Sequence, residues 1–247
     1  MKENRSLIIF LFFISITTNF LFSQKTNIQS ALFIQVTPNF NNDLKLISYD
    51  TNIVKLYSLF DFKLFEFKSL KNDISKNPLK DVLENAYFVH HKDSVYGYLE
   101  TESFDFGRQN IDQATYINRI LNRNDIETEF NSLKTKLIST VKNEDSSILT
   151  ESFEITDSKD STYKTIWRMS YSKKLKKLPF SISPYLDSSK NCKFFQIVGE
   201  NPSKYFKDKN LTMEGFTGMI RLEENNNFDA DFIMKKFQQY IKKIGKN

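Results

Sequence analysis

The chain has 247 residues, of which 40% are hydrophobic and 26% are charged, and its formal net charge is +5. This length suits one domain, or two small ones at most, and is sufficient to bury a core without disulfide bonds. The small basic excess does not by itself indicate a polyanion, so we expect no nucleic-acid partner. The single cysteine, Cys192, excludes an intramolecular disulfide, and we interpret it as a small buried residue.

Residues 1–23 have the three-part layout of a secretory signal peptide. Lys2 and Arg5 form a basic start, residues 7–22 are mainly apolar, and Ser23 places a small residue before the expected cut at Gln24. The apolar part is shorter than the roughly 20 residues of a membrane-spanning helix and is interrupted by polar residues. We therefore predict a bacterial protein that is exported to a periplasm or secreted. Residues 24–247 are expected to form a single globular domain, with no transmembrane segment after cleavage.

Short alternating stretches separated by Asn- and Asp-rich turns predict strands in the first part of this domain. They are expected at residues 31–37, 44–48, 53–58, 62–67, 86–91 and 95–100. Pro78 suits the first turn of a helix, so a short helix is expected from Pro78 to about residue 85.

The middle of the chain predicts two helices. Apolar residues recur at helical spacing first within residues 111–121 and then from Ile126 through Leu133 and Leu137 to Val141. Asn124 and Asp125 are suitable caps for the second segment. These two segments form the expected central helical pair.

The remainder predicts further strands and a terminal helix. Residues 149–155 and 163–171 alternate clearly and form the expected hairpin, and residues 193–198 and 216–222 are two further strands. From Asp229 onward, apolar residues occupy one face of a helix and lysines the other, with Asp229 as its cap.

This order of elements predicts an α+β fold. It comprises a mostly antiparallel sheet, the central helical pair, and a C-terminal amphipathic helix packed on the sheet. In element order only, it is similar to PsbP/Mog1-like domains, in which helices flank a sheet and the chain closes with a helix.

The candidate catalytic and metal-binding groups are few. His90 and His91 are the only histidines, and on a strand their rings would point to opposite faces, so no metal site is expected. The residues around Cys192 match no protease signature. Ser-x-x-Lys occurs at Ser139, Ser161 and Ser170 without the companion motifs of serine acyl enzymes.

Two other patterns bear on acid chemistry and on phosphate binding. The acidic residues that might pair in a glycosidase are Glu100, Glu102 and Asp105, and Asp229 with Asp231. The stretch at residues 215–218 begins and ends with glycine, but it is too short for a nucleotide-binding loop and is interpreted as a turn that leads into a strand. No cofactor is predicted.

The densest basic run contains Lys173, Lys174, Lys176 and Lys177. These lysines are the candidate contacts to an anionic membrane surface or an acidic glycan, although such runs are usually solvated.

Taken together, these patterns favour an exported, non-catalytic binding module or an accessory protein of the cell envelope. Its partner would be another envelope protein or an anionic surface. Two alternatives stay open: a hydrolase with a dispersed acidic or serine-centred site, and a binder of anionic membranes or glycans. Whether the protein is an enzyme is not decided by the sequence.

Overall fold

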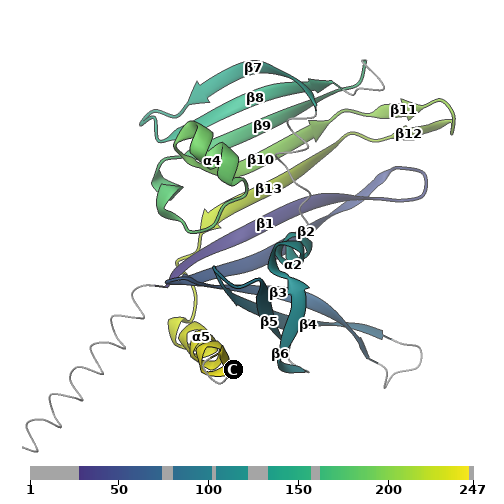
Figure 1. Ribbon diagram of the computed structural model, residues 1–247. Coiled ribbons are helices and arrows are strands. Elements are labelled where there is room, and N and C mark those ends of the chain that lie inside the picture. The colour runs from purple at the N-terminus through teal and green to yellow at the C-terminus, as the bar shows by residue number, and fades with distance from the viewer. Residues whose placement is uncertain (1–27, 74–79, 102–103, 122–132, 157–161, 245–247) are drawn as a thin grey trace, which may run out of the picture.

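The computed structural model describes residues 28–73, 80–101, 104–121, 133–156 and 162–244. These residues form one antiparallel sheet of 11 strands in the order β6-β5-β4-β3-β2-β1-β13-β10-β9-β8-β7, and a two-stranded hairpin, β11-β12 (Figure 1). The strands are β1 (Gln29–Phe40), β2 (Leu46–Leu59), β3 (Phe62–Asp73), β4 (Lys80–His91), β5 (Tyr96–Thr101), β6 (Phe104–Asp112), β7 (Lys134–Lys142), β8 (Ile148–Thr156), β9 (Lys164–Ser172), β10 (Lys193–Asn201), β11 (Lys204–Phe206), β12 (Leu211–Met213) and β13 (Phe216–Glu224). The helices described are α2 (Gln113–Ile120), the 3₁₀ helix η1 (Lys174–Lys177), α4 (Pro184–Lys190) and α5 (Ala230–Ile244).

The sheet consists of two meanders joined along one seam. Strands β1 to β6 follow one another in space as they do in sequence, and so do β7 to β10, to which β13 is added. The seam is the pairing of β1 with β13, in which Ala31 lies opposite Glu224 and Val36 opposite Met219. The first and the last strand of the sheet in sequence are therefore neighbours at its centre.

Alternation of apolar side chains explains the hairpin between β8 and β9. Leu149 lies opposite Tyr171 and Phe153 opposite Trp167, so the apolar residues of both strands share one face. This hairpin is confirmed at the register that the alternation predicts. The apolar face packs into the main core of the molecule, which contains Tyr171 and Met169.

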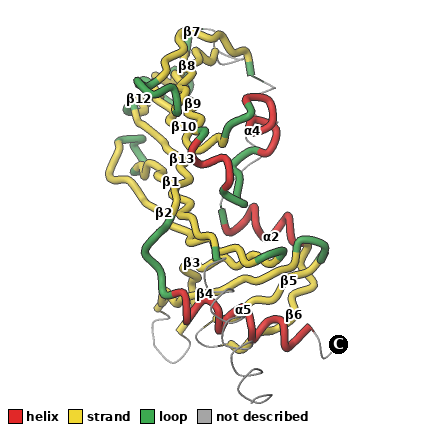
Figure 2. Tube along the Cα trace, turned by 90° about the vertical axis from the view of Figure 1, so that its left-hand side faces the viewer, coloured by secondary structure: helices red, strands yellow, loops and turns green. Residues whose placement is uncertain are grey.

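We call the face that carries Phe33, Phe65 and Phe88 the inner face, because Figure 2 shows it in the angle between the two meanders, together with α2 and α4. Tyr116 of α2 and Leu186 of α4 belong to the core cluster on that face. On the opposite, outer face of the first meander, α5 forms a second cluster. Strands β2 to β4 are thus covered on both faces.

The expected central helical pair is wrong, and with it the α+β class and the likeness to PsbP/Mog1-like domains. Residues 134–142, expected in the second helix, form strand β7, and the first helix is the short α2. The remainder of the second expected helix, residues 126–132, lies outside the described residues. Leu137 and Val141 have the spacing of one helix face, but in the strand the bulge at Ile138 puts them on different faces, with Leu137 opposite Phe153 and Val141 opposite Thr150. The β-branched residues in this segment and the open edge of β8 favour the strand.

Two local predictions in the first meander are also wrong. The helix expected from Pro78 to residue 85 is part of β4 where it is described, and β4 pairs with β3 from Lys80 to His91. The expected turn at residues 50–52 lies inside the long strand β2, where Asp50 is opposite Thr37. In both places a neighbouring strand offers a continuous ladder of hydrogen bonds, which outweighs the local preference of Asp and Asn for turns.

Strand β7 forms one edge of the sheet, and all nine of its residues are exposed. The register with β8 shifts between Leu137 and Ser139, so Ile138 forms a bulge. Lys134, Lys136 and Lys142 add charge to the same edge. Bulges and lysines are common features of sheet edges that do not pair with other chains.

The expected C-terminal helix is α5. The Asp229 carboxylate accepts a hydrogen bond from the Phe232 backbone amide at 3.0 Å, so Asp229 caps the helix as expected. Ile233, Met234, Phe237 and Tyr240 are buried against the outer face of β2, β3 and β4. Burial also raises the pKa of Tyr240 to about 12, because the charged phenolate would lose its hydration there.

Replacing Phe237, which is fully buried, with Ala should destabilise the protein by about 3–5 kcal/mol, since it removes a phenyl ring from a closed cluster. The matched change on the same helix is Ile241→Ala, where 42% of the residue is exposed, and this variant should unfold close to the wild type. Thermal and urea unfolding measure both. Equal midpoints for the two variants would mean that α5 does not depend on its buried stripe.

Candidate functional site

The two histidines point to opposite faces of β4, as expected for adjacent residues of a strand. His90 is buried on the inner face and stacks on Phe65, whereas His91 lies on the outer face beside Phe62. No group of three or more His, Cys, Asp or Glu side chains within the described ranges is arranged to hold a metal ion. The histidines therefore do not converge on one ligand.

His90 connects β4 to the beginning of α2. Its Nδ1 atom lies 3.2 Å from the carbonyl oxygen of His91, and its Nε2 atom lies 3.3 Å from the side-chain nitrogen of Gln113. A carbonyl only accepts, so Nδ1 carries the proton and Nε2 accepts from Gln113. Burial, with a smaller contribution from the nearby Lys63, lowers the pKa of His90 to about 4. His90 is therefore neutral at ordinary pH and has a structural role.

The buried, neutral His90 predicts a loss of stability in mild acid. The unfolded chain binds a proton near pH 6.5 but the folded protein only near pH 4, so stability should fall by about 3 kcal/mol across that window. His90→Gln should remove this dependence, whereas His91→Gln should keep it. Urea unfolding at a series of pH values tests this. If the free energy of unfolding of His90→Gln depends on pH as strongly as that of the wild type, the assignment is contradicted.

The other candidate nucleophiles have structural surroundings. Cys192 is a free, buried thiol in the main core cluster. The Ser170 hydroxyl lies 3.0 Å from that of Thr150 on the neighbouring strand, and Ser139 is on the edge strand β7. Ser161 lies outside the described residues. Among the described contacts of Cys192, Ser170 and Ser139, none is with a general base.

The acidic candidates whose side chains the structure describes do not form a catalytic pair. Glu100 bonds to Lys236 of α5 at 2.5 Å, which ties β5 to the helix. Asp229 is the cap of α5, and Asp231 follows in its first turn. Glu102 and the side chain of Asp105 lie outside the described part of the chain.

The basic run is a short 3₁₀ helix, and its lysines are exposed but not equivalent. Lys174 pairs with Asp145 at 2.8 Å, and this ion pair and bonds from Ser147 hold the pKa of the Asp145 carboxyl well below its usual range. Lys176 donates to the side-chain oxygen of Asn191, the left-handed residue that ends α4. Among the residues that the structure describes, no carboxylate lies within salt-bridge distance of Lys173 or Lys177, so these two lysines are less constrained than Lys174 and Lys176.

If the run contacts an anionic surface, Lys173 and Lys177 should supply most of the attraction. We expect weak binding to anionic lipid vesicles that disappears as salt rises, since each lysine near such a surface contributes on the order of 1 kcal/mol. Lys173→Gln with Lys177→Gln should abolish most of it, and changing Lys174 and Lys176 as well should abolish the rest without unfolding. Vesicle sedimentation measures this. Binding that survives high salt would show that the run is not the determinant.

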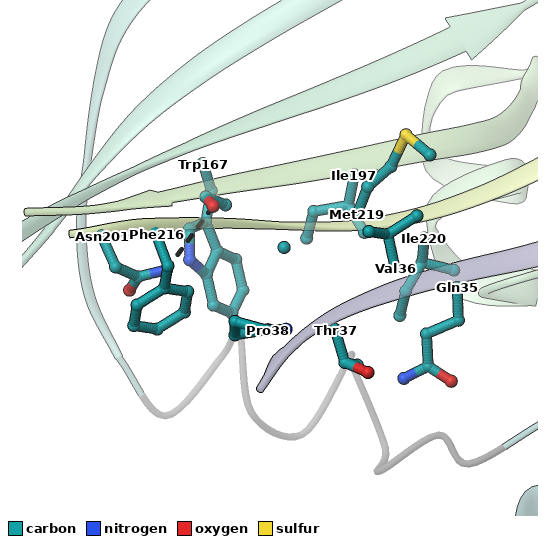
Figure 3. A pocket seen from close by; sticks show the side chains of 12 residues that line it. Gln35, Val36, Thr37, Pro38, Trp167, Ile197, Asn201, Phe216, Met219 and Ile220 are labelled. Atoms are coloured by element: carbon teal, nitrogen blue, oxygen red, sulfur yellow. Dashed lines mark hydrogen bonds between the residues drawn. The ribbon is translucent and has the colours of Figure 1, made fainter. Parts of the chain in front are cut away.

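The most distinctive site lies on the inner face and crosses the seam. Gly199 of β10 and Gly218 of β13 lie directly opposite each other in the ladder, and Trp167 of β9 is the next residue across from Gly199. The two glycines form the floor of a pocket of about 330 Å³ (Figure 3). Gly218 lies inside β13, which covers the strand expected at residues 216–222.

The walls of this pocket are mainly apolar. Figure 3 shows the indole of Trp167 near Phe216 and Pro38 at one end. Ile197 and Ile220 from the inner face contribute apolar surface farther along. The described residues that line it are Gln35, Val36, Thr37, Pro38, Trp167, Ile197, Gly199, Asn201, Phe216, Gly218, Met219 and Ile220. None of them is charged, so the lining supplies a few amide and hydroxyl groups but no acid or base.

The glycine pair is not explained by backbone conformation or by crowding. No glycine in the described residues has a positive φ. A Cβ atom on Gly218 would meet only the Val36 carbonyl oxygen, at 3.8 Å, which is ordinary contact. A Cβ atom on Gly199 would meet the Trp167 indole at 3.4 Å, so the ring packs closely on this backbone. A side chain at Gly218 would fit the protein and would project into the pocket.

Sequence reasoning missed this pocket because its parts are distant in the chain. The signal was present as glycines inside two alternating strands, which often mark the close approach of a ligand. Without the register between β10 and β13, nothing brings Gly199 and Gly218 together. No family model matches this sequence, and no curated protein matches it either. The site therefore has to be interpreted from its own chemistry.

Proposed function

We propose that this protein is an exported, non-catalytic binding module that holds a small apolar molecule in the pocket over Gly199 and Gly218. The observation that carries the proposal is Gly218, a mid-strand glycine that neither φ nor crowding requires. Glycine inside a strand costs about 0.5–1 kcal/mol relative to alanine. A ligand in the open space above the sheet explains why glycine, and not alanine, occupies position 218.

The shape and chemistry of the pocket support a single small ligand. Its volume lies at the low end of the range typical of small-molecule sites, about 300–1,000 Å³. Trp167 and Phe216 offer aromatic surface, and Thr37 and Asn201 offer polar groups that can orient the ligand. A ring compound with one or two polar substituents fits this combination.

The export part of the proposal rests on residues 1–23, which precede the described structure. No helix in the described ranges is long and apolar enough to cross a membrane. The hydrolase alternative has no supporting observation among the described residues, and we do not propose it further.

Trp167 is the only tryptophan in the chain, so tryptophan fluorescence reports on this pocket alone. A neutral naphthylamine probe should change the Trp167 emission in a saturable way. Gly218→Val should weaken this binding by about tenfold or more, because the new side chain occupies the space of the ligand. The control is Thr217→Val, the adjacent residue on the outer face, which should bind as the wild type does.

Stability separates loss of binding from loss of folding. Gly218→Ala should raise the free energy of unfolding by about 0.5–1 kcal/mol while it weakens probe binding, because strand preference and ligand space act in opposite directions. Equal probe affinity in Gly218→Val and Thr217→Val would contradict the proposal.

A further inference from the structure

A second cavity, of about 280 Å³, lies at the other end of the seam from the apolar pocket. There β1 begins and β13 ends (Figure 1). Its walls come from three parts of the chain, namely the start of β1, the residues that follow β13, and η1. It is more enclosed than the pocket over the glycines. We call it the seam-end cavity.

Four apolar side chains supply one part of the lining, Ile28, Leu175, Leu178 and Phe228. Ile28 is buried, and the other three are half-buried. The Phe228 ring is held against Tyr57, with 5.5 Å between the ring centres. A molecule that fills the seam-end cavity therefore needs an apolar part.

The buried polar residues of this cavity are satisfied by each other. The Asn225 side chain donates to the Ser30 hydroxyl at 3.1 Å, and its oxygen accepts the Asn227 backbone amide at 3.1 Å. Ser30 and Asn225 are both buried. These bonds fix the wall where β1 meets the end of β13, so the cavity is formed before any ligand enters.

Two opposite charges line the cavity without neutralising each other. Glu224 lies opposite Ala31 in the ladder and so projects from the inner face, and Lys177 is the last residue of η1. Lys174 also lines the cavity, but it is paired with Asp145. Within the described part of the chain, neither Lys177 nor Glu224 has an opposite charge at salt-bridge distance, each other included.

We propose that the seam-end cavity binds a small zwitterion with an apolar side chain, that is, an α-amino acid of the leucine type. An ion of one sign would be attracted by one of the two residues and repelled by the other. A zwitterion presents its carboxylate to Lys177 and its ammonium to Glu224, and both contacts are charge-assisted. Its side chain lies against Ile28 and Phe228. The site does not depend on the function proposed for the apolar pocket.

The test is thermal unfolding of the full chain with L-leucine and with two analogues that each lack one charge. Leucine without its ammonium is 4-methylpentanoate, and leucine without its carboxylate is 3-methylbutylamine. Leucine should raise the unfolding temperature to a plateau, as specific binding does. Each analogue should need about tenfold or more of the leucine concentration for the same effect, because it loses one ionic contact.

Variants assign each charge to its partner. Lys177→Gln should weaken leucine binding about tenfold or more without weakening that of 3-methylbutylamine, which has no carboxylate. Glu224→Gln should weaken leucine binding without weakening that of 4-methylpentanoate. The matched controls are Lys173→Gln, in the same basic run but outside the cavity, and Glu223→Gln, whose side chain bonds to Arg221 on the outer face.

Lys177 and Glu224 are exposed, so both variants should unfold near the wild-type temperature when no ligand is present. The proposal is overturned if leucine gives no saturating response, or if either analogue acts at the same concentration as leucine. It is also overturned if Lys177→Gln and Glu224→Gln respond to leucine as the two controls do. Trp167 does not line this cavity, so a change of its emission with leucine would place the binding in the apolar pocket instead.

Discussion

The pairing of β1 with β13 is the interaction on which the rest of the structure depends. It is the ladder that joins the two meanders within the described sheet. Just beyond β13, the Asn225 backbone amide donates to the Ser30 carbonyl, and its side chain donates to the Ser30 hydroxyl. Phe228 then packs against Tyr57 and directs the chain into α5 on the outer face. The seam therefore positions the pocket floor and the covering helix together.

The two meanders have different physical roles. The first is buried on both faces over β2 to β4, where neighbouring residues such as Leu64 and Phe65 point into different core clusters. The second meander has its apolar residues on the inner face. Its outer face bears exposed ion pairs, such as that between Arg168 and Glu200, as is typical of antiparallel sheets with one solvent-exposed face. Rigid support comes from the first meander, and most of the apolar pocket comes from the second and from β1 at the seam.

Much of the strand content could be predicted from the sequence, because alternation over β8, β9 and β13 fits no other structure. The terminal helix was equally clear, since its apolar residues recur at intervals that a strand would place on both faces. Strand β7 was missed because Leu137 and Val141 have the spacing of one helix face, and the bulge at Ile138 that separates them in the strand leaves no mark in the sequence. The middle of β2 was missed because Asp50 resembles a turn residue when its ladder partner is unknown. The candidate pocket was not predictable, because Gly199 meets Gly218 only through long-range register.

The position of the seam also bears on how the protein acquires its structure. Ser30 and Asn225 are 195 residues apart, so closing the seam requires a very large loop, whereas each hairpin of the first meander closes a short one. Folds dominated by such distant contacts form slowly. A chain that is synthesised in sequence order can complete the first meander early, but one edge of β1 stays unpaired until β13 has formed. During that interval the edge of β1 is the place where a chaperone, or an unwanted second chain, would bind.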